Sequence, residues 1–162
     1  MVKKILVFGL ILFSLVSFSF AAQPIAKTDK SEMATDFTLP DLNGNKVSLY
    51  EYKGNKPVIL FFWATWCPHC RSGIEILKNM HGKLSADGIE ILAINIGESK
   101  EKVMKFANSM GLKFKILLDL DSSLASVYSV MGIPTYLIID KEGYITFRGH
   151  YMPEDNYKDY IK

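Results

Sequence analysis

The amino-acid sequence predicts a single α/β domain in which a central mixed sheet is flanked by helices. Apolar segments of strand length alternate along the chain with segments of helical periodicity, which is the pattern of a sheet covered by helices. One segment, residues 58–64 (VILFFWA), is apolar throughout, as expected for a strand that is buried on both faces. Near the C-terminal end, residues 135–139 and 145–148 flank a short turn and add antiparallel strands at one side of the sheet.

Length and composition permit one folded domain with a substantial core. The chain has 162 residues, of which 49% are hydrophobic, and this content argues against disorder. Its 19 basic and 17 acidic residues nearly balance, and they form no clustered basic stripe. We therefore expect no nucleic acid among its partners.

Residues 1–21 are predicted to be a secretory signal peptide that is not part of the fold. Lys3 and Lys4 precede an apolar run over residues 5–20, and small residues follow near its end. An uncleaved membrane anchor is the alternative, because the run is close to the shortest length that spans a bilayer. A cleaved signal peptide and an uncleaved anchor both predict a periplasmic or otherwise extracytoplasmic protein. Anchoring to the inner membrane is expected only if the segment stays uncleaved.

The segment between the signal peptide and the domain is predicted to be a linker. Residues 22–35 are polar and lack periodicity, and the domain is expected to cover residues 36–162. It begins with a predicted β-hairpin, because residues 37–39 and 46–49 flank an Asn-Gly pair, the strongest short signal for a hairpin turn.

The other elements follow the central strand in order. Residues 71–83 are predicted to form a helix, and residues 89–96 the next strand. Ser99 is expected to cap a helix over residues 100–110, and Gly111 to end it in the left-handed conformation. Shorter predicted elements complete the alternation: a strand at 114–118, a helix at 122–128 and a final helix at 153–161.

The only two cysteines, Cys67 and Cys70, stand where the central strand passes into the next helix. A thiolate at a helix start faces unpaired N–H groups and the positive end of the helix dipole, which lowers the pKa of Cys67 and makes it a nucleophile. Cys70 lies on the same helix face and can attack a mixed disulfide formed at Cys67. A structural disulfide is the alternative, but a bridge across two residues closes too small a loop to add much stability. The spacing favours a redox-active pair.

Residues beside the cysteines are predicted to contact the substrate. Trp66 is expected to form exposed contact surface, and Pro68 and His69 lie between the cysteines. A protonated His69 stabilises a neighbouring thiolate, which favours the reduced form and makes the pair more oxidising. A second segment places Ile133-Pro134 just before a strand, where a cis peptide bond would leave the backbone of Ile133 open to an extended substrate.

These motifs resemble the TlpA/ResA group of thiol–disulfide oxidoreductases in the thioredoxin-like superfamily. The resemblance is carried by residues 37–44, 62–67, 93–99 and 132–140. It implies a thioredoxin-like fold with an N-terminal β-hairpin and a β–α insert over residues 90–110. It also implies that Cys67 attacks, that Cys70 resolves the mixed disulfide, that Pro134 is cis, and that Glu98 is a candidate for proton handling.

Several positions depart from the pattern of the group. The Pro-His pair between the cysteines is similar to that of the oxidant DsbA, whereas many ResA-like proteins place proline last. Gly73 stands where ResA-like proteins carry a glutamate, and Glu75 where a proline is common. Phe61 replaces the buried acid of thioredoxins.

Other kinds of site do not fit the residues. Zinc needs four ligands, which one Cys-x-x-Cys with dispersed histidines does not supply, so no metal site is expected. Haem attachment needs a histidine where the chain has Arg71. Peroxiredoxins place a proline and a threonine before the peroxidatic cysteine where this chain has Leu60 and Ala64, so a peroxidase is not expected.

The resemblance implies an exported enzyme that exchanges disulfides with protein thiols and disulfides through Cys67 and Cys70, without a cofactor. The leading hypothesis is a reductant in cytochrome c maturation or a related periplasmic pathway, acting on partners such as apocytochrome c and kept reduced by a membrane thiol donor. Two alternatives stay open. One is a DsbA-like dithiol oxidase, and the other is a non-catalytic module that binds extended peptides.

Overall fold

The computed structural model describes residues 32–161. The predicted signal peptide, residues 1–21, and most of the predicted linker lie outside these residues. Within them, no helix combines the length and the apolar character needed to span a bilayer.

A five-stranded mixed sheet forms the centre of the domain, in the order β5-β4-β3-β6-β7. The strands are β3 (Val58–Trp63), β4 (Glu90–Ile96), β5 (Lys115–Asp119), β6 (Thr135–Ile139) and β7 (Ile145–Gly149). The middle strand, β3, runs parallel to β4 and antiparallel to β6. β5 is parallel to β4, and β7 is antiparallel to β6, so the predicted mixed sheet is confirmed.

The central strand is apolar throughout because each of its faces belongs to a different core. Ile59, Phe61 and Trp63 point into one hydrophobic cluster, and the residues between them point into the other. All six side chains of β3 are buried. Burying each large aliphatic or aromatic side chain contributes about 1.5–3 kcal/mol, so β3 anchors both layers of the domain.

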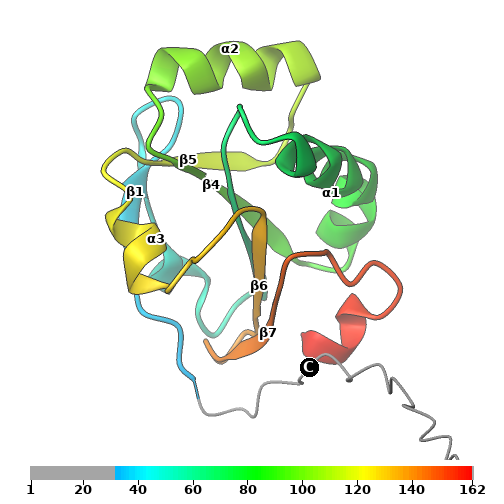
Figure 1. Cartoon of the computed structure of the whole chain (residues 1–162). Coiled ribbons are helices and arrows are strands. Elements are labelled where there is room, and N and C mark those ends of the chain that lie inside the picture. Colours follow the sequence, from blue (N-terminus) through cyan, green and yellow to red (C-terminus); the bar gives the residue numbers. More distant parts are fainter. Residues whose placement is uncertain (1–31, 162) are drawn as a thin grey trace, which may run out of the picture.

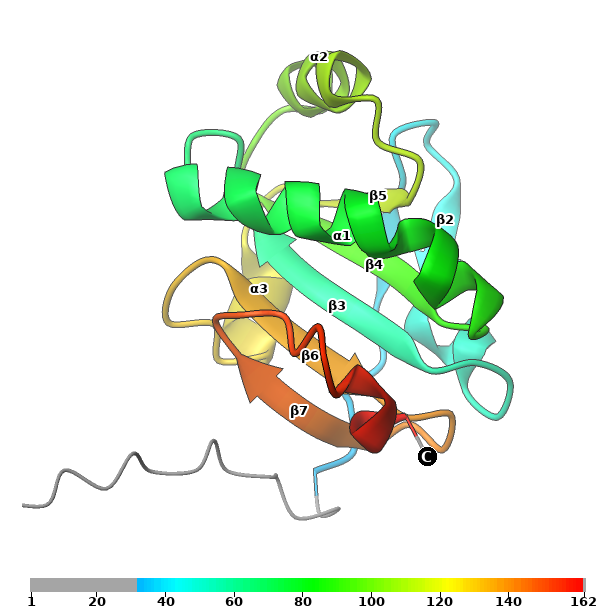
Figure 2. The ribbon, with the colours of Figure 1, turned by 90° about the vertical axis from the view of Figure 1, so that its right-hand side faces the viewer.

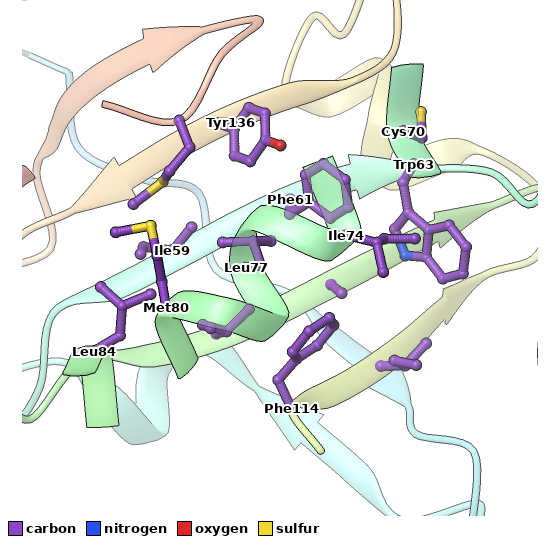
Figure 3. Close-up of a cluster of buried hydrophobic side chains, with 14 of the residues drawn as sticks. Ile59, Phe61, Trp63, Cys70, Ile74, Leu77, Met80, Leu84, Phe114 and Tyr136 are labelled. Carbon is purple, nitrogen blue, oxygen red and sulfur yellow. The ribbon is translucent and has the colours of Figure 1, made fainter. Parts of the chain in front are cut away.

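Helices cover both faces of this sheet (Figures 1 and 2). α1 (Pro68–Ala86) and α2 (Lys100–Met110) pack with the C-terminal segment on one core. α3 (Ser123–Val127) and the 3-10 helix η1 (Leu49–Tyr52) cover the other. Figure 3 shows the first core, where Ile74 and Leu77 of α1 face Phe61 and Trp63 of the sheet.

The N-terminal hairpin is formed by β1 (Thr38–Pro40) and β2 (Lys46–Ser48), as predicted. Its turn is closed by the Asp41 carboxylate, which accepts hydrogen bonds from the backbone N–H groups of Asn43 and Asn45. Asp41 also forms a β-bridge with Leu117, which places the hairpin against the β5 edge of the sheet.

Two segments differ from the sequence prediction. Residues 32–34, at the end of the predicted linker, already contact the sheet, because Met33 forms a β-bridge with Tyr144. The predicted helix at 153–161 is wrong. Only Tyr157–Tyr160 is helical, as the 3-10 helix η2, because the Asn156 N–H closes a turn on the Pro153 carbonyl instead of starting an α-helix.

Candidate active site

The two cysteines lie at the start of α1, directly after the central strand. Cys67 is the N-cap of α1, Pro68 is the first helical residue, and the Cys67 sulfur accepts the backbone N–H of Cys70 at 3.1 Å. This bond satisfies one of the N–H groups that a helix start leaves unpaired, and proline is favoured there because it has no N–H to satisfy. Cys67 and Cys70 form a disulfide. The first helix therefore begins at the redox pair, before the predicted residue 71.

The peptide bond between Ile133 and Pro134 is cis, as the resemblance implied, and it faces the disulfide. The Ile133 carbonyl oxygen lies 3.8 Å from the Cys67 sulfur. On the far side, the Pro134 carbonyl accepts a hydrogen bond of 2.8 Å from Nδ1 of His150, which follows β7. Cys67 and Ile133, which are 66 residues apart in sequence, therefore meet at the disulfide.

The loop between β3 and the cysteines is held through Thr65. Glu98, after β4, accepts the Thr65 N–H at 2.6 Å and the Thr65 hydroxyl at 2.7 Å. The Arg71 guanidinium donates two hydrogen bonds, of 3.1 and 3.0 Å, to the Thr65 carbonyl. All polar groups of Thr65 are thus paired, and this residue lies two positions before Cys67. Such contacts fix the position of the attacking group before substrate arrives.

Glu98 is itself held by two further side chains. Asn95 donates a hydrogen bond of 2.9 Å, and Lys102 forms an ion pair of 2.7 Å. Burial acts to raise the pKa of Glu98, but the hydrogen bonds from Lys102, Thr65 and Asn95 outweigh it and lower the pKa to about 2. A carboxyl group with this pKa stays ionised at neutral pH. These contacts indicate that Glu98 anchors the loop, and they do not support the predicted role in proton handling.

The other predicted substrate contacts surround the disulfide. Trp66 is 64% exposed, which fits contact surface, while Pro68 and His69 are exposed on the first turn of α1. Ile133 and Pro134 are partly exposed on the opposite side. The structure therefore brings the predicted residues together around one sulfur pair.

Two positions that differ from the residue pattern of the TlpA/ResA group and thioredoxins have surroundings that are normal for their residue types. Phe61 is fully buried and packs against Tyr136, with ring centroids 4.7 Å apart. Glu75 is exposed and pairs with Lys78 at 3.8 Å. Within the part of the chain that the structure describes, no three His, Cys, Asp or Glu side chains gather as metal ligands would.

Sequence reasoning missed several residues of the site. No motif or spacing in the sequence marks Arg71, Asn95, Lys102 or His150 as part of it. A charged residue at the end of a buried strand, such as Glu98, needs partners, and this requirement was the only signal for Asn95 and Lys102.

A Cys-x-x-Cys at the start of the helix that follows the central strand, opposite a cis-proline, is the arrangement of thioredoxin-like proteins. The fold is of this class. The chain belongs to the AhpC/TSA family, whose sequence model matches residues 31–148.

The relatives are thiol–disulfide oxidoreductases by name. The chain is 39% identical to thiol-disulfide oxidoreductase ResA of Bacillus subtilis (strain 168) over 110 residues. The match covers 68% of this chain and 61% of the relative, so the chain spans less than two thirds of that relative's length. It is 34% identical to ResA of Bacillus cereus (strain ATCC 10987 / NRS 248) over 83% of this chain and 79% of that one. A crystal structure from Chlorobium tepidum, assigned as thiol:disulfide interchange protein DsbE, matches with a TM-score of 0.73 and 30% identity, over 81% of this chain and 94% of that one.

Proposed function

We propose that the protein is an extracytoplasmic thiol–disulfide oxidoreductase that exchanges disulfides with protein partners through Cys67 and Cys70. One observation carries the proposal: the Cys67 sulfur caps a helix and accepts the Cys70 N–H, while the open Ile133 backbone lies across from it. The same hydrogen bond and the helix dipole stabilise a thiolate at Cys67 when the pair is reduced.

The exchange proceeds in two steps. The Cys67 thiolate attacks one sulfur of a client disulfide, which forms a Cys67–client bond and releases the other client sulfur as a thiolate. The Cys70 thiol then loses its proton and attacks the Cys67 sulfur, which forms the Cys67–Cys70 disulfide and releases the second client thiolate. Two electrons pass from the protein to the client, and the reverse sequence oxidises a client dithiol.

For the direction of electron flow, we propose that the protein reduces its clients in cytochrome c maturation or a related periplasmic pathway. Apocytochrome c would be a client, and a membrane thiol donor would keep the protein reduced. The similarity to proteins named ResA and DsbE supports this direction. Oxidation of dithiols is the second candidate, and one observation favours it: His69 stands exposed between the two cysteines at a helix start. Leu60 and Ala64, where peroxiredoxins carry proline and threonine, are both fully buried apolar residues, which argues against a peroxidase.

Substitution of each cysteine tests the proposal. Cys67→Ser is expected to abolish exchange with protein disulfides. Cys70→Ser is expected to retain the first step and to accumulate a covalent complex with clients that dithiothreitol dissolves. Unchanged exchange activity in Cys67→Ser would contradict the proposal, and unchanged binding of peptides by a protein without any exchange activity would favour the non-catalytic module.

A further inference from the structure

A cavity of about 360 Å³ lies beside the disulfide. Its walls are the first turns of α1, the Ile133–Pro134 peptide and the segment that follows β7. Ile133 borders this cavity and also places its carbonyl 3.8 Å from the Cys67 sulfur. A client chain that pairs with Ile133 while its cysteine reaches Cys67 must therefore pass the mouth of the cavity.

Tyr136 of β6 contributes a phenol to the wall of this cavity. Its side chain is 1% exposed, and its ring packs on Phe61 (Figure 3). The hydroxyl lies directly against Gly73 of α1, because a Cβ atom added at Gly73 would overlap the Tyr136 oxygen. Glycine at this position makes room for the hydroxyl at the cavity, one helical turn beyond Cys70.

The Tyr136 hydroxyl has no hydrogen-bond partner among residues 32–161. Its oxygen is not among the polar atoms that this part of the chain encloses completely without a partner, so the hydroxyl can bond to a group that enters the cavity. Burial raises the pKa of Tyr136, and the nearby charge of Glu154 raises it further. The phenol therefore stays protonated and offers a neutral donor toward a cavity that lies next to the redox pair.

Glu154 is the acidic residue on the rim of the same cavity. It is exposed, so its carboxylate is free to accept a hydrogen bond from a group that enters. A client carboxylate would be repelled by this charge. A carboxamide fits both groups, because its carbonyl oxygen accepts from Tyr136 while its NH₂ donates to Glu154. An aliphatic side chain would leave the phenol unpaired.

We propose that this cavity binds the side-chain carboxamide of a glutamine or asparagine close to the client cysteine, and that Tyr136 determines this specificity. The inference rests on the proposed function, since it names the class of client segment that the exchange reaction takes. Tyr136 contacts the client beside the reacting sulfurs and takes no part in the sulfur chemistry.

The test uses short peptides that carry one cysteine as a disulfide with nitrothiobenzoate. They are identical except for Gln, Leu or Glu at one position, placed in turn at each of the positions near the cysteine. The rate of nitrothiobenzoate release by the reduced full-length protein is measured for each peptide. At the position that reaches the cavity, the wild type is expected to react about fivefold faster with Gln than with Leu, the ratio that one net hydrogen bond of about 1 kcal/mol gives.

Tyr136→Phe is expected to lower the Gln/Leu ratio clearly below the wild-type value, because it removes the donor to the carboxamide oxygen and leaves only Glu154 to pair with the NH₂ group. The rate with the free reagent dithiobis-nitrobenzoate is measured for each variant to report the reactivity of the sulfurs themselves. Tyr128→Phe is the matched control, because Tyr128 is also buried but donates its hydroxyl to the Thr35 carbonyl at 2.6 Å, outside the cavity. This variant should keep the wild-type ratio. Glu154→Ala, an exposed substitution that the fold tolerates, should lower the Gln/Leu ratio and raise the rate with the Glu peptide.

The inference is overturned if the wild type shows no Gln/Leu preference at any position, or if Tyr136→Phe keeps the preference. Should Tyr136→Phe fail to fold, an unchanged ratio in Glu154→Ala would overturn it equally. A wild-type protein that reacts with none of the disulfides, the free reagent included, would instead overturn the proposed function on which the inference rests.

Discussion

Thr65 and Ile133 lie on opposite sides of the disulfide and are held in different ways. Thr65 is buried, and side chains from two other elements satisfy its N–H, hydroxyl and carbonyl groups. Ile133 is partly exposed, and its carbonyl faces the sulfur of Cys67 beside a cavity. The Thr65 side, which we call the held side, fixes the attacking sulfur. The Ile133 side, which we call the open side, leaves the backbone and the cavity accessible to a client. Substitutions on the held side should therefore change stability and reactivity, whereas those on the open side should change client choice alone.

The largest effect is expected at Glu98, the anchor of the held side. Glu98→Ala leaves Thr65 and Asn95 with unpaired buried groups, which should lower the free energy of unfolding by about 3 kcal/mol and slow exchange with every disulfide. Urea denaturation and exchange assays measure both. The control is Glu75→Ala, which breaks an exposed pair with Lys78 and should change stability by less than about 0.5 kcal/mol. Equal effects of the two variants would contradict the held-side account.

The pH dependence of stability tests whether Glu98 stabilises the fold as an ionised carboxylate or only as a neutral hydrogen-bonding group. The folded pKa of Glu98, about 2, lies below its ordinary value, so the ionised carboxylate stabilises the fold above about pH 4.5. This contribution is lost as pH falls toward 2. Denaturation of the wild type and Glu98→Gln should therefore show a stability difference that is largest above pH 5 and narrows in acid. A difference that is constant with pH would argue against a depressed pKa.

The sequence predicted the elements that local chemistry determines. Ser99 caps α2, and Gly111 ends it with a φ of 61°, because both roles depend on neighbouring residues alone. The helix start at Cys67 is likewise local. The contacts of Thr65 with Glu98 and of Pro134 with His150 join distant segments, and no periodicity encodes them. The same holds for Gly73, whose lack of a side chain matters only because Tyr136 lies against it.

Among the exposed residues around the disulfide, Trp66→Ala should reduce the rate with protein clients roughly three- to tenfold, because an exposed aromatic contact contributes about 1 kcal/mol to a transient interface. Trp66 is 64% exposed, so stability should change by less than about 0.5 kcal/mol. Stopped-flow exchange with a protein disulfide measures the rate, with dithiobis-nitrobenzoate as a small comparison substrate. Tyr50→Ala, similarly exposed but remote from the disulfide, should leave both rates unchanged. If Tyr50→Ala lowered the rate with protein clients as much as Trp66→Ala, the loss would not come from contact beside the disulfide.

The smallest effect is expected at His69, which faces solvent beside the sulfurs. His69→Ala removes an imidazole between the two cysteines whose N–H groups can favour the thiolate, so the reduction potential should become more negative by on the order of 20 mV. Equilibration with glutathione buffers measures this shift. His81→Ala, on the same helix but packed against Phe114, should leave the potential unchanged. A shift of equal size in both variants would show that the effect does not come from the neighbourhood of the cysteines.

The reduction potential of the wild-type Cys67–Cys70 pair tests the central claim most directly. A structural disulfide has a potential below about −300 mV, and thioredoxin has about −270 mV. A redox-active pair with His69 at the helix start should be less reducing than thioredoxin, with a potential above about −270 mV. A value at or below that figure would contradict the role of His69, and a value below about −300 mV would contradict the assignment of Cys67 and Cys70 as an exchanging pair.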